Sequence, residues 1–339
     1  MSDLPPPPRR RTVLDRPTRE FVDQGSVSSV PHRLEPRSGH ADPVLDEDAT
    51  STEWFLLPGG PTGHVRVEVV RPVGNVGPMP VVLFLHGLGH GLGHVLRDAL
   101  GDADTRTSSP THASRLARTF ALGTDAAVVL VDYASAPEAA YPIAVEQCYA
   151  VARWLCERGG EIGLDGSRIV AVGDSVGGNL VAALTLLAKE RGGIRLARQV
   201  LLCPVTDTDF GTSSYREFAE GYFVGRDTMR RFWDRYAPDV RQRGLATLSP
   251  LRATLEQLAG LPPALVVTSE ADVVRDEGEA YSARLRAAGV EVVSMRYHGT
   301  IHGFMVLDRL RDTDSARAAL IQTLDIVHLA LHTRRGRAH

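Results

Sequence analysis

Lysine is almost absent from this chain of 339 residues, since Lys189 is the only one and every other basic side chain is an arginine. The formal net charge is only −3 at pH 7, which argues against a nucleic-acid partner. Long apolar runs are missing as well: no segment approaches the roughly twenty apolar residues that a membrane helix needs. We therefore expect neither nucleic-acid binding nor membrane insertion.

Cysteine is also scarce, with Cys148, Cys156 and Cys203 and no CxxC pair among them. Each lies in an apolar periodic stretch, which favours buried free thiols and a reducing cytoplasm. The first residues, MSDLPPPPRRR, carry proline and charge but lack the apolar core of a signal peptide. We expect residues 1–13 to form a disordered leader of a cytoplasmic protein.

What the chain does contain is an alternation of short apolar runs and helical stretches, within an ordinary globular composition of 43% apolar and 23% charged residues. Residues 65–70 alternate as a half-buried strand does, and continuous apolar runs occupy residues 81–85, 126–131, 200–202 and 264–268. Helical patterns cover residues 144–157 and 276–288. This order predicts an α/β fold with a doubly wound, mostly parallel sheet whose active residues lie at the carboxyl ends of the strands.

Two segments do not follow that alternation, namely residues 14–50 and residues 206–247. The second is rich in aromatic side chains, which are typical either of a plain core or of a lid over a pocket. Within it, Ser214 and Glu217 have the spacing of a capping box that opens a helix.

The motif GxSxG, centred on Ser175, interrupts an apolar strand just before a helix-forming stretch. Such a sharp strand-to-helix turn projects the central side chain out of the sheet, and Gly173 and Gly177 leave room for strand and helix to pass closely. The pattern predicts a nucleophile at Ser175, with a structural turn as the alternative.

A serine nucleophile needs a histidine base that is itself oriented by a carboxylate. His302 follows the strand pattern of residues 292–297 and is the preferred base, with His298 second. Asp272 ends the predicted strand ALVVTSEAD (264–272) and lies between serine and histidine in chain order, as an α/β-hydrolase requires. We interpret Asp276 and Glu277 as acidic residues of a first helical turn.

The loop HGLGHGLGH after residue 85 is dense in glycine, which suits an oxyanion hole built from backbone N–H groups. Val176 is a further donor from the strand-to-helix turn around Ser175, which we call the elbow. A rival interpretation takes His86, His90 and His94, spaced four apart, as metal ligands on a helix. The interleaved glycines argue against such a helix, so we expect no metal.

Together these motifs resemble the hormone-sensitive lipase family of α/β-hydrolase esterases, which includes bacterial type IV carboxylesterases and acetyl hydrolases. The resemblance covers nearly everything after Leu57. The blocks that carry it are GDSVGGN (173–179), DYASAPEAAYP (132–142), PVTDTDF (204–210), SPL (249–251), EADVVRDEGEAY (270–281) and YHGTIHGF (297–304).

The resemblance implies Ser175 as nucleophile, His302 as base and Asp272 as its orienting partner. It implies backbone donors of an oxyanion hole at Leu88, Gly89 and Val176, and no metal or organic cofactor. It also divides the chain into a core and a cap. The segments are the leader (1–13), an N-terminal cap segment (14–50), the first part of the core (51–205), a cap insert (206–247) and the second part of the core (248–339).

Two features depart from the family pattern. HGLG replaces HGGG, which places the Leu88 side chain beside the acyl site and predicts a narrower pocket. The loop between Gly93 and Thr111 is longer than expected and could reshape the entrance.

The sequence thus predicts a serine carboxylesterase for short to medium acyl esters that acts through an acyl-enzyme on Ser175. Its partner is a small-molecule ester, and the terminal helix near residues 316–331 could join two copies into a homodimer. The alternatives are an amidase or peptidase on the same fold, or a noncatalytic small-ligand receptor.

Overall fold

A computed structural model of the chain describes residues 12–25, 49–75, 77–87, 110–136, 138–307 and 309–333. Within them an eight-stranded sheet has the order β1-β2-β4-β3-β5-β6-β7-β8. β1 and β2 are antiparallel, β2 is antiparallel to β4, and the other neighbours are parallel. The strands are β1 (Thr50–Pro58), β2 (His64–Pro72), β3 (Met79–Leu85), β4 (Ala127–Asp132), β5 (Leu164–Asp174), β6 (Arg198–Leu202), β7 (Ala264–Ala271) and β8 (Val292–Ile301).

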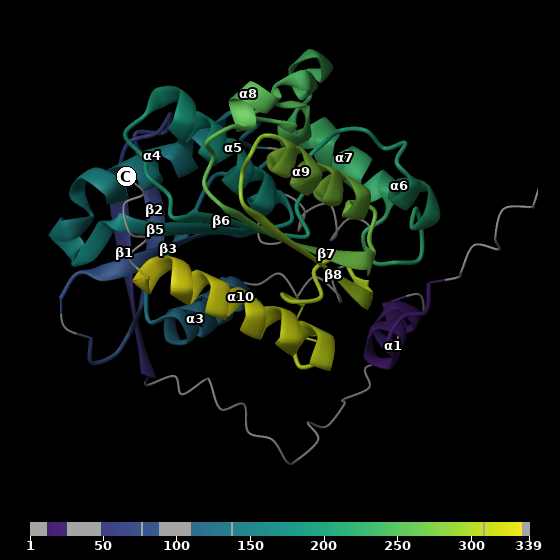
Figure 1. Ribbon diagram of the computed structural model, residues 1–339, viewed down its shortest axis with the longest axis horizontal. Helices are drawn as coiled ribbons and strands as arrows, with labels where there is room; N and C mark the ends of the chain where they lie inside the picture. The colour runs from purple at the N-terminus through teal and green to yellow at the C-terminus, as the bar shows by residue number, and fades with distance from the viewer. Residues whose placement is uncertain are drawn as a thin grey trace, which may run out of the picture.

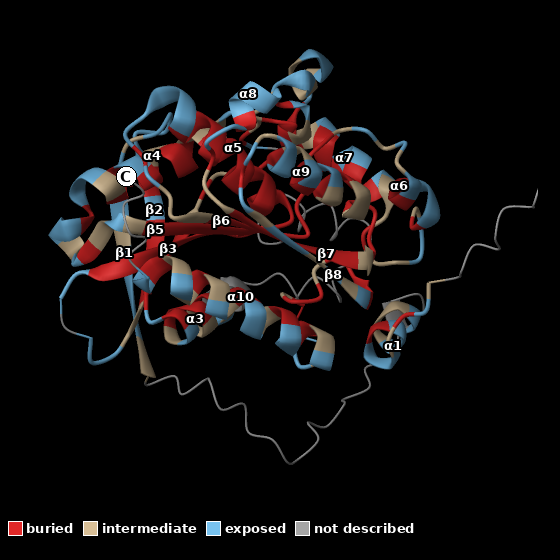
Figure 2. Ribbon diagram, viewed as in Figure 1, coloured by how far each residue is buried: buried red, intermediate tan, exposed pale blue. Residues whose placement is uncertain are grey.

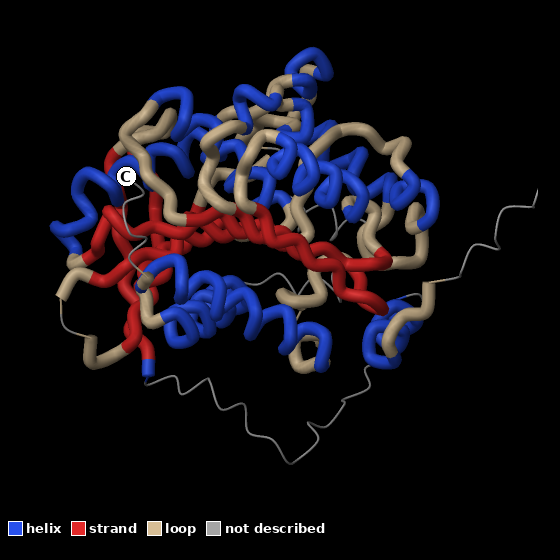
Figure 3. The backbone as a smooth tube through the Cα atoms, viewed as in Figure 1, coloured by secondary structure: helices blue, strands red, loops and turns tan. Residues whose placement is uncertain are grey.

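Helices cover both faces of this sheet, as the alternating pattern predicted (Figure 1; Figure 3). One face carries α3 (Pro110–Thr124) and α10 (Asp314–His332), and the other carries α4 (Ile143–Arg158), α5 (Val176–Arg191) and α9 (Arg275–Ala287). The remaining helices are α1 (Arg16–Gly25), α6 (Ser213–Glu217), α7 (Arg226–Tyr236) and α8 (Leu255–Leu258), with 3-10 turns at Gly159–Ile162, Val240–Gly244 and Pro250–Arg252. The predicted doubly wound, mostly parallel α/β fold is confirmed.

The central strands are apolar throughout because helices cover both of their faces. Every residue of β3 is buried, and the buried residues form a continuous layer along the sheet (Figure 2). β1 differs, since its Trp54 and Leu56 side chains are 52% and 64% exposed. β1 was not among the strands predicted from the sequence, because it depends on pairing with β2 along its whole length rather than on burial.

The insert of residues 206–247 contains α6, α7 and the turn Val240–Gly244. Most of its aromatic side chains are buried and belong to the core, namely Tyr215, Phe218, Phe232, Trp233 and Tyr236. The predicted capping box at Ser214 is wrong. The α6 N-cap is Thr212, whose side chain accepts the Tyr215 N–H, and the Ser214 hydroxyl instead donates to the Val273 carbonyl at 2.6 Å.

The terminal helix predicted near residues 316–331 is present as α10, which packs against α3. Ile321 and Leu329 on it are exposed, and homodimer formation stays a prediction. Across the described ranges, none of the helices combines the length and the apolarity that crossing a membrane would take. Residues 1–11 of the predicted leader and most of the N-terminal cap segment lie outside the described residues.

Candidate active site

Ser175 occupies the turn between the end of β5 and the start of α5. Its backbone has φ 55° and ψ −116°, a conformation that costs a non-glycine residue about 1–3 kcal/mol. Neighbouring backbone groups hold it there: the Ser175 N–H donates to the Leu202 carbonyl at 2.8 Å, and the Val205 N–H donates to the Ser175 carbonyl at 3.2 Å. Hydrogen bonds to the end of β6 and to the residues after it therefore hold the strained backbone of Ser175 in place, which fixes the position of its hydroxyl.

The elbow needs glycine where the chain passes closest to itself. A Cβ on Gly177 would lie 1.8 Å from the Leu85 carbonyl oxygen, and one on Gly87 would lie 2.1 Å from the Asp174 carbonyl oxygen. Because both contacts are to backbone, no side-chain movement could relieve them.

We expect Gly177→Ala to destabilise the fold by about 4 kcal/mol or more, because β3 or α5 must shift to admit the methyl group. Chemical denaturation followed by circular dichroism measures this as a lower midpoint. Gly160→Ala is the matched control, since nothing lies within 4 Å of a Cβ there. Equal midpoints for the two variants would contradict the close approach.

The structure brings the side chains of Ser175, His302 and Asp272 into one hydrogen-bonded chain. His302 Nε2 lies 2.9 Å from Ser175 Oγ, and His302 Nδ1 lies 2.8 Å from Asp272 Oδ2. All three residues are buried, and each directly follows a strand: β5, β7 or β8. Parallel strands end at the same edge of the sheet, which is why residues so distant in sequence meet here.

The second-choice residues lie elsewhere. The His298 side chain is 74% exposed and pairs with Glu270, Nδ1 to Oε1, at 3.1 Å. Asp276 accepts the Ser214 N–H at 2.7 Å in the first turn of α9. Neither is part of the chain that joins Ser175 to Asp272.

The surroundings of His302 favour its charged form. Burial alone lowers the pKa of His302, but the charge of Asp272, the hydrogen bond to it and the charge of Asp174 together outweigh burial. The net result is a pKa raised from the ordinary value of 6.5. The Asp272 carboxylate is in turn fixed by the Val274 N–H, which donates to its other oxygen at 3.1 Å. This pair can hold a proton arriving from Ser175.

Of the expected oxyanion donors, Leu88 and Gly89 lie outside the described residues. Val176 is the first residue of α5, where backbone N–H groups have no partner within the helix. Two residues that the sequence did not single out bind His86 and Gly87, directly after β3. Asp174 accepts the Gly87 N–H at 3.0 Å, and the Tyr133 hydroxyl donates to the His86 carbonyl. Asp174 lies in the block GDSVGGN and Tyr133 in the block DYASAPEAAYP, and these positions were the signal in the sequence that could have identified them.

Of the three histidines considered as metal ligands, only His86 is described, and its ring stacks on that of Tyr133 with centroids 4.9 Å apart. His90 and His94 lie outside the described residues. Among the residues that are described, no three His, Cys, Asp or Glu side chains gather as they would around a metal ion.

Comparison with known proteins agrees with this architecture. Residues 104–306 match a protein family described by its α/β-hydrolase fold. The carboxylesterase NlhH of Mycobacterium tuberculosis is 37% identical over 231 residues, covering 67% of this chain and 67% of the relative. The esterase LipI of the same species is 34% identical over 295 residues, covering 86% of each.

Among solved structures, a thermostable esterase from Pseudomonas putida superimposes with a TM-score of 0.82 at 38% identity, covering 95% of this chain and 99% of that one. Fold and relatives together define the chain as a carboxylic ester hydrolase. It belongs to the α/β-hydrolase family, in the group of the hormone-sensitive lipase type.

Proposed function

We propose that this chain hydrolyses short to medium acyl esters through an acyl-enzyme on Ser175. The observation that carries the proposal is the continuous hydrogen-bonded chain from Ser175 Oγ through both nitrogens of His302 to Asp272. Without any rearrangement, the proposed nucleophile contacts the proposed base, and the base contacts the carboxylate that would orient it.

In the first half-reaction, Ser175 Oγ attacks the ester carbonyl carbon while His302 Nε2 takes the hydroxyl proton. Asp272 accepts the Nδ1 proton of His302 in a hydrogen bond, which keeps Nε2 free to act as base and stabilises the imidazolium. Collapse of the tetrahedral intermediate breaks the bond to the alcohol oxygen, and His302 returns the proton to the leaving alcohol.

In the second half-reaction, His302 takes a proton from water, which attacks the acyl carbon. The bond to Ser175 Oγ then breaks, the serine recovers its proton, and the carboxylic acid leaves. We assign the backbone N–H groups of Leu88, Gly89 and Val176 to the negative oxygen of both intermediates. Val176 fits this role because the N-terminus of α5 favours negative charge.

We further propose that the N-terminal segment and the insert form a cap that walls the substrate site. One contact between them supports this: Phe21 of α1 meets Phe223 of the insert edge to face, with centroids 5.5 Å apart. A second contact comes from Thr12, just before the N-terminal cap segment, whose hydroxyl donates to Glu217 of the insert at 3.5 Å. The insert also begins directly after Val205, whose N–H donates to the Ser175 carbonyl.

A panel of nitrophenyl esters graded from acetate to laurate tests the proposal, with the matched nitroanilides beside them. We expect kcat/KM to be greatest among the short and medium acyl chains and to fall by a factor of about a hundred or more on the anilides. Comparable turnover of anilides would favour an amidase, and no turnover of any ester would favour a receptor.

Activity should fall with decreasing pH, because an imidazolium cannot accept the serine proton. Since the pKa of His302 is raised, half of the maximal kcat/KM should be reached above pH 6.5, the ordinary histidine value. A rate profile across the acidic and neutral range measures this. A plateau extending well below that value would contradict His302 as the base.

We also propose a cytoplasmic location, supported by three free thiols. Cys148 and Cys203 are buried and Cys156 is partly buried, and burial raises the pKa of each thiol. Such thiols suit a reducing compartment. Fractionation of native cells with an antibody to the chain tests the location.

A further inference from the structure

Asn179, four residues after Ser175, joins both ends of the insert to the helix that follows the elbow. Its side-chain amide donates one hydrogen bond to the Val205 carbonyl and one to the Leu248 carbonyl, each 2.9 Å long. Val205 directly precedes the insert and Leu248 directly follows it. Asn179 is buried, so water cannot replace either bond.

Only a side chain with two N–H donors at one nitrogen can serve two carbonyls in this way. Aspartate would place a carboxylate against both oxygens, and leucine of similar size would leave both without a donor. The backbone N–H of Asn179 donates to the Ser175 carbonyl at 3.2 Å. One residue therefore contacts the nucleophile and both ends of the insert.

A second set of contacts with the insert comes from α9, the helix that follows Asp272. Glu277 accepts the N–H groups of Thr206 and Asp207 at 2.7 and 3.4 Å, and Asp276 accepts the Ser214 N–H at 2.7 Å. Arg275 contacts the insert as well, with its guanidinium 5.1 Å from the ring centroid of Phe218, the residue that follows α6.

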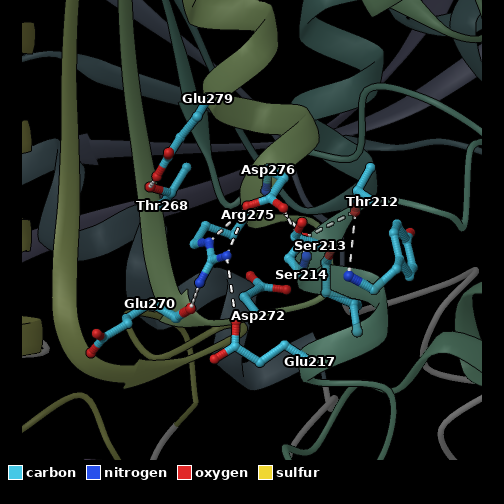
Figure 4. A network of polar contacts seen from close by, with 12 residues as sticks. Thr212, Ser213, Ser214, Glu217, Thr268, Glu270, Asp272, Arg275, Asp276 and Glu279 are labelled. Atoms are coloured by element: carbon cyan, nitrogen blue, oxygen red, sulfur yellow. Dashed lines mark hydrogen bonds and ion pairs between the residues drawn. The ribbon is translucent and has the colours of Figure 1, made fainter. Parts of the chain in front are cut away.

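Figure 4 shows how Arg275 and Asp276 meet the insert beside the turn that carries Asp272. The Arg275 guanidinium lies between the Glu270 carbonyl, which accepts its hydrogen bond at 2.9 Å, and the carboxylates of Asp276 and Glu217 at 2.9 and 3.9 Å. The insert is thus held by the helices that follow two of the three site residues.

We propose that Asn179 is a positioning residue that fixes the insert relative to Ser175, with Asp276 as its counterpart on the side of Asp272. This inference rests on the esterase function proposed above. It adds that Asn179, in the helix that follows the elbow, sets the position of the cap. Without the two hydrogen bonds of the Asn179 side chain, the insert occupies its binding-competent position for only a fraction of the time. The apparent affinity for the ester is then the intrinsic affinity multiplied by that fraction.

The test compares Asn179→Leu with the wild-type full-length chain. We expect KM for the best nitrophenyl ester to rise about tenfold while kcat changes by less than about threefold. Amide hydrogen exchange across residues 206–247 should speed up by about tenfold or more. The pH at half-maximal kcat should not move, because the contacts of His302 remain. A purely structural defect would instead reduce the amount of active enzyme and leave KM unchanged.

Asn75→Leu is the matched control, since Asn75 is the other asparagine of the chain and its amide binds Asp125, an exposed contact, at 2.9 Å. Should Asn179→Leu fail to fold, Asp276→Ala tests the proposal instead. We expect the same rise in KM and the same faster amide hydrogen exchange across residues 206–247. Unchanged KM and exchange in the folded variant would overturn the proposal. If the wild-type chain turned over no ester, the proposed function would fail, whereas the exchange measurement would still decide the anchoring.

Discussion

Ser175→Ala should reduce kcat on a short nitrophenyl ester by a factor on the order of a million, with the fold intact. The substitution removes the oxygen that forms the acyl bond, and within the described ranges the hydroxyl that His302 Nε2 contacts is that of Ser175. The contacts that hold the elbow are made by the Ser175 backbone, so alanine keeps them. Steady-state rates and a thermal melt of both proteins measure the two parts of this expectation.

Ser294→Ala controls for the loss of a hydroxyl, because Ser294 is exposed on β8, away from the elbow. A fluorophosphonate probe adds an independent readout: mass spectrometry should find the adduct on the wild-type peptide that contains Ser175 and no adduct on the variant. Residual kcat above about a tenth of the wild-type value would show that the nucleophile lies elsewhere.

Asp272→Asn is expected to lower kcat by about ten thousandfold with little change in KM. The introduced amide can donate to His302 Nδ1, which would favour the tautomer with a proton on Nε2, where the serine proton must be accepted. Geometry at the site should persist, because the side-chain oxygen of the introduced asparagine can still accept the Val274 N–H. Rates over a range of substrate concentrations separate kcat from KM.

Asp325→Asn gives the matched control, since Asp325 is exposed on α10. The pH profile adds a second criterion. The Asp272 carboxylate raises the pKa of His302 against the effect of burial, so removing its charge should shift the apparent pKa of His302 downward. An Asp272→Asn enzyme with near-normal kcat would exclude Asp272 as the orienting carboxylate.

Much of the fold follows from local sequence pattern. The apolar runs predicted as strands are present as β3, β4, β6 and β7, because strands covered on both faces must be apolar along their whole length. β1 escaped prediction because its exposed face carries apolar side chains and its stability comes from pairing with β2. The capping box failed because the Ser214 hydroxyl has a tertiary partner, Val273, that no local pattern reveals.

The sequence by itself determined most of the sheet strands, the elbow at Ser175 and a short set of candidate partners, since periodicity, glycine spacing and strand ends are local properties. Only the tertiary structure decided which candidates meet. His302 reaches Ser175 whereas His298, four residues earlier, is mostly exposed, because His298 lies within the edge strand β8 while His302 lies in the turn that follows the strand's carboxyl end. The anchoring of the insert by Asn179 also depends on folding, since it joins carbonyls 43 residues apart, at positions 205 and 248.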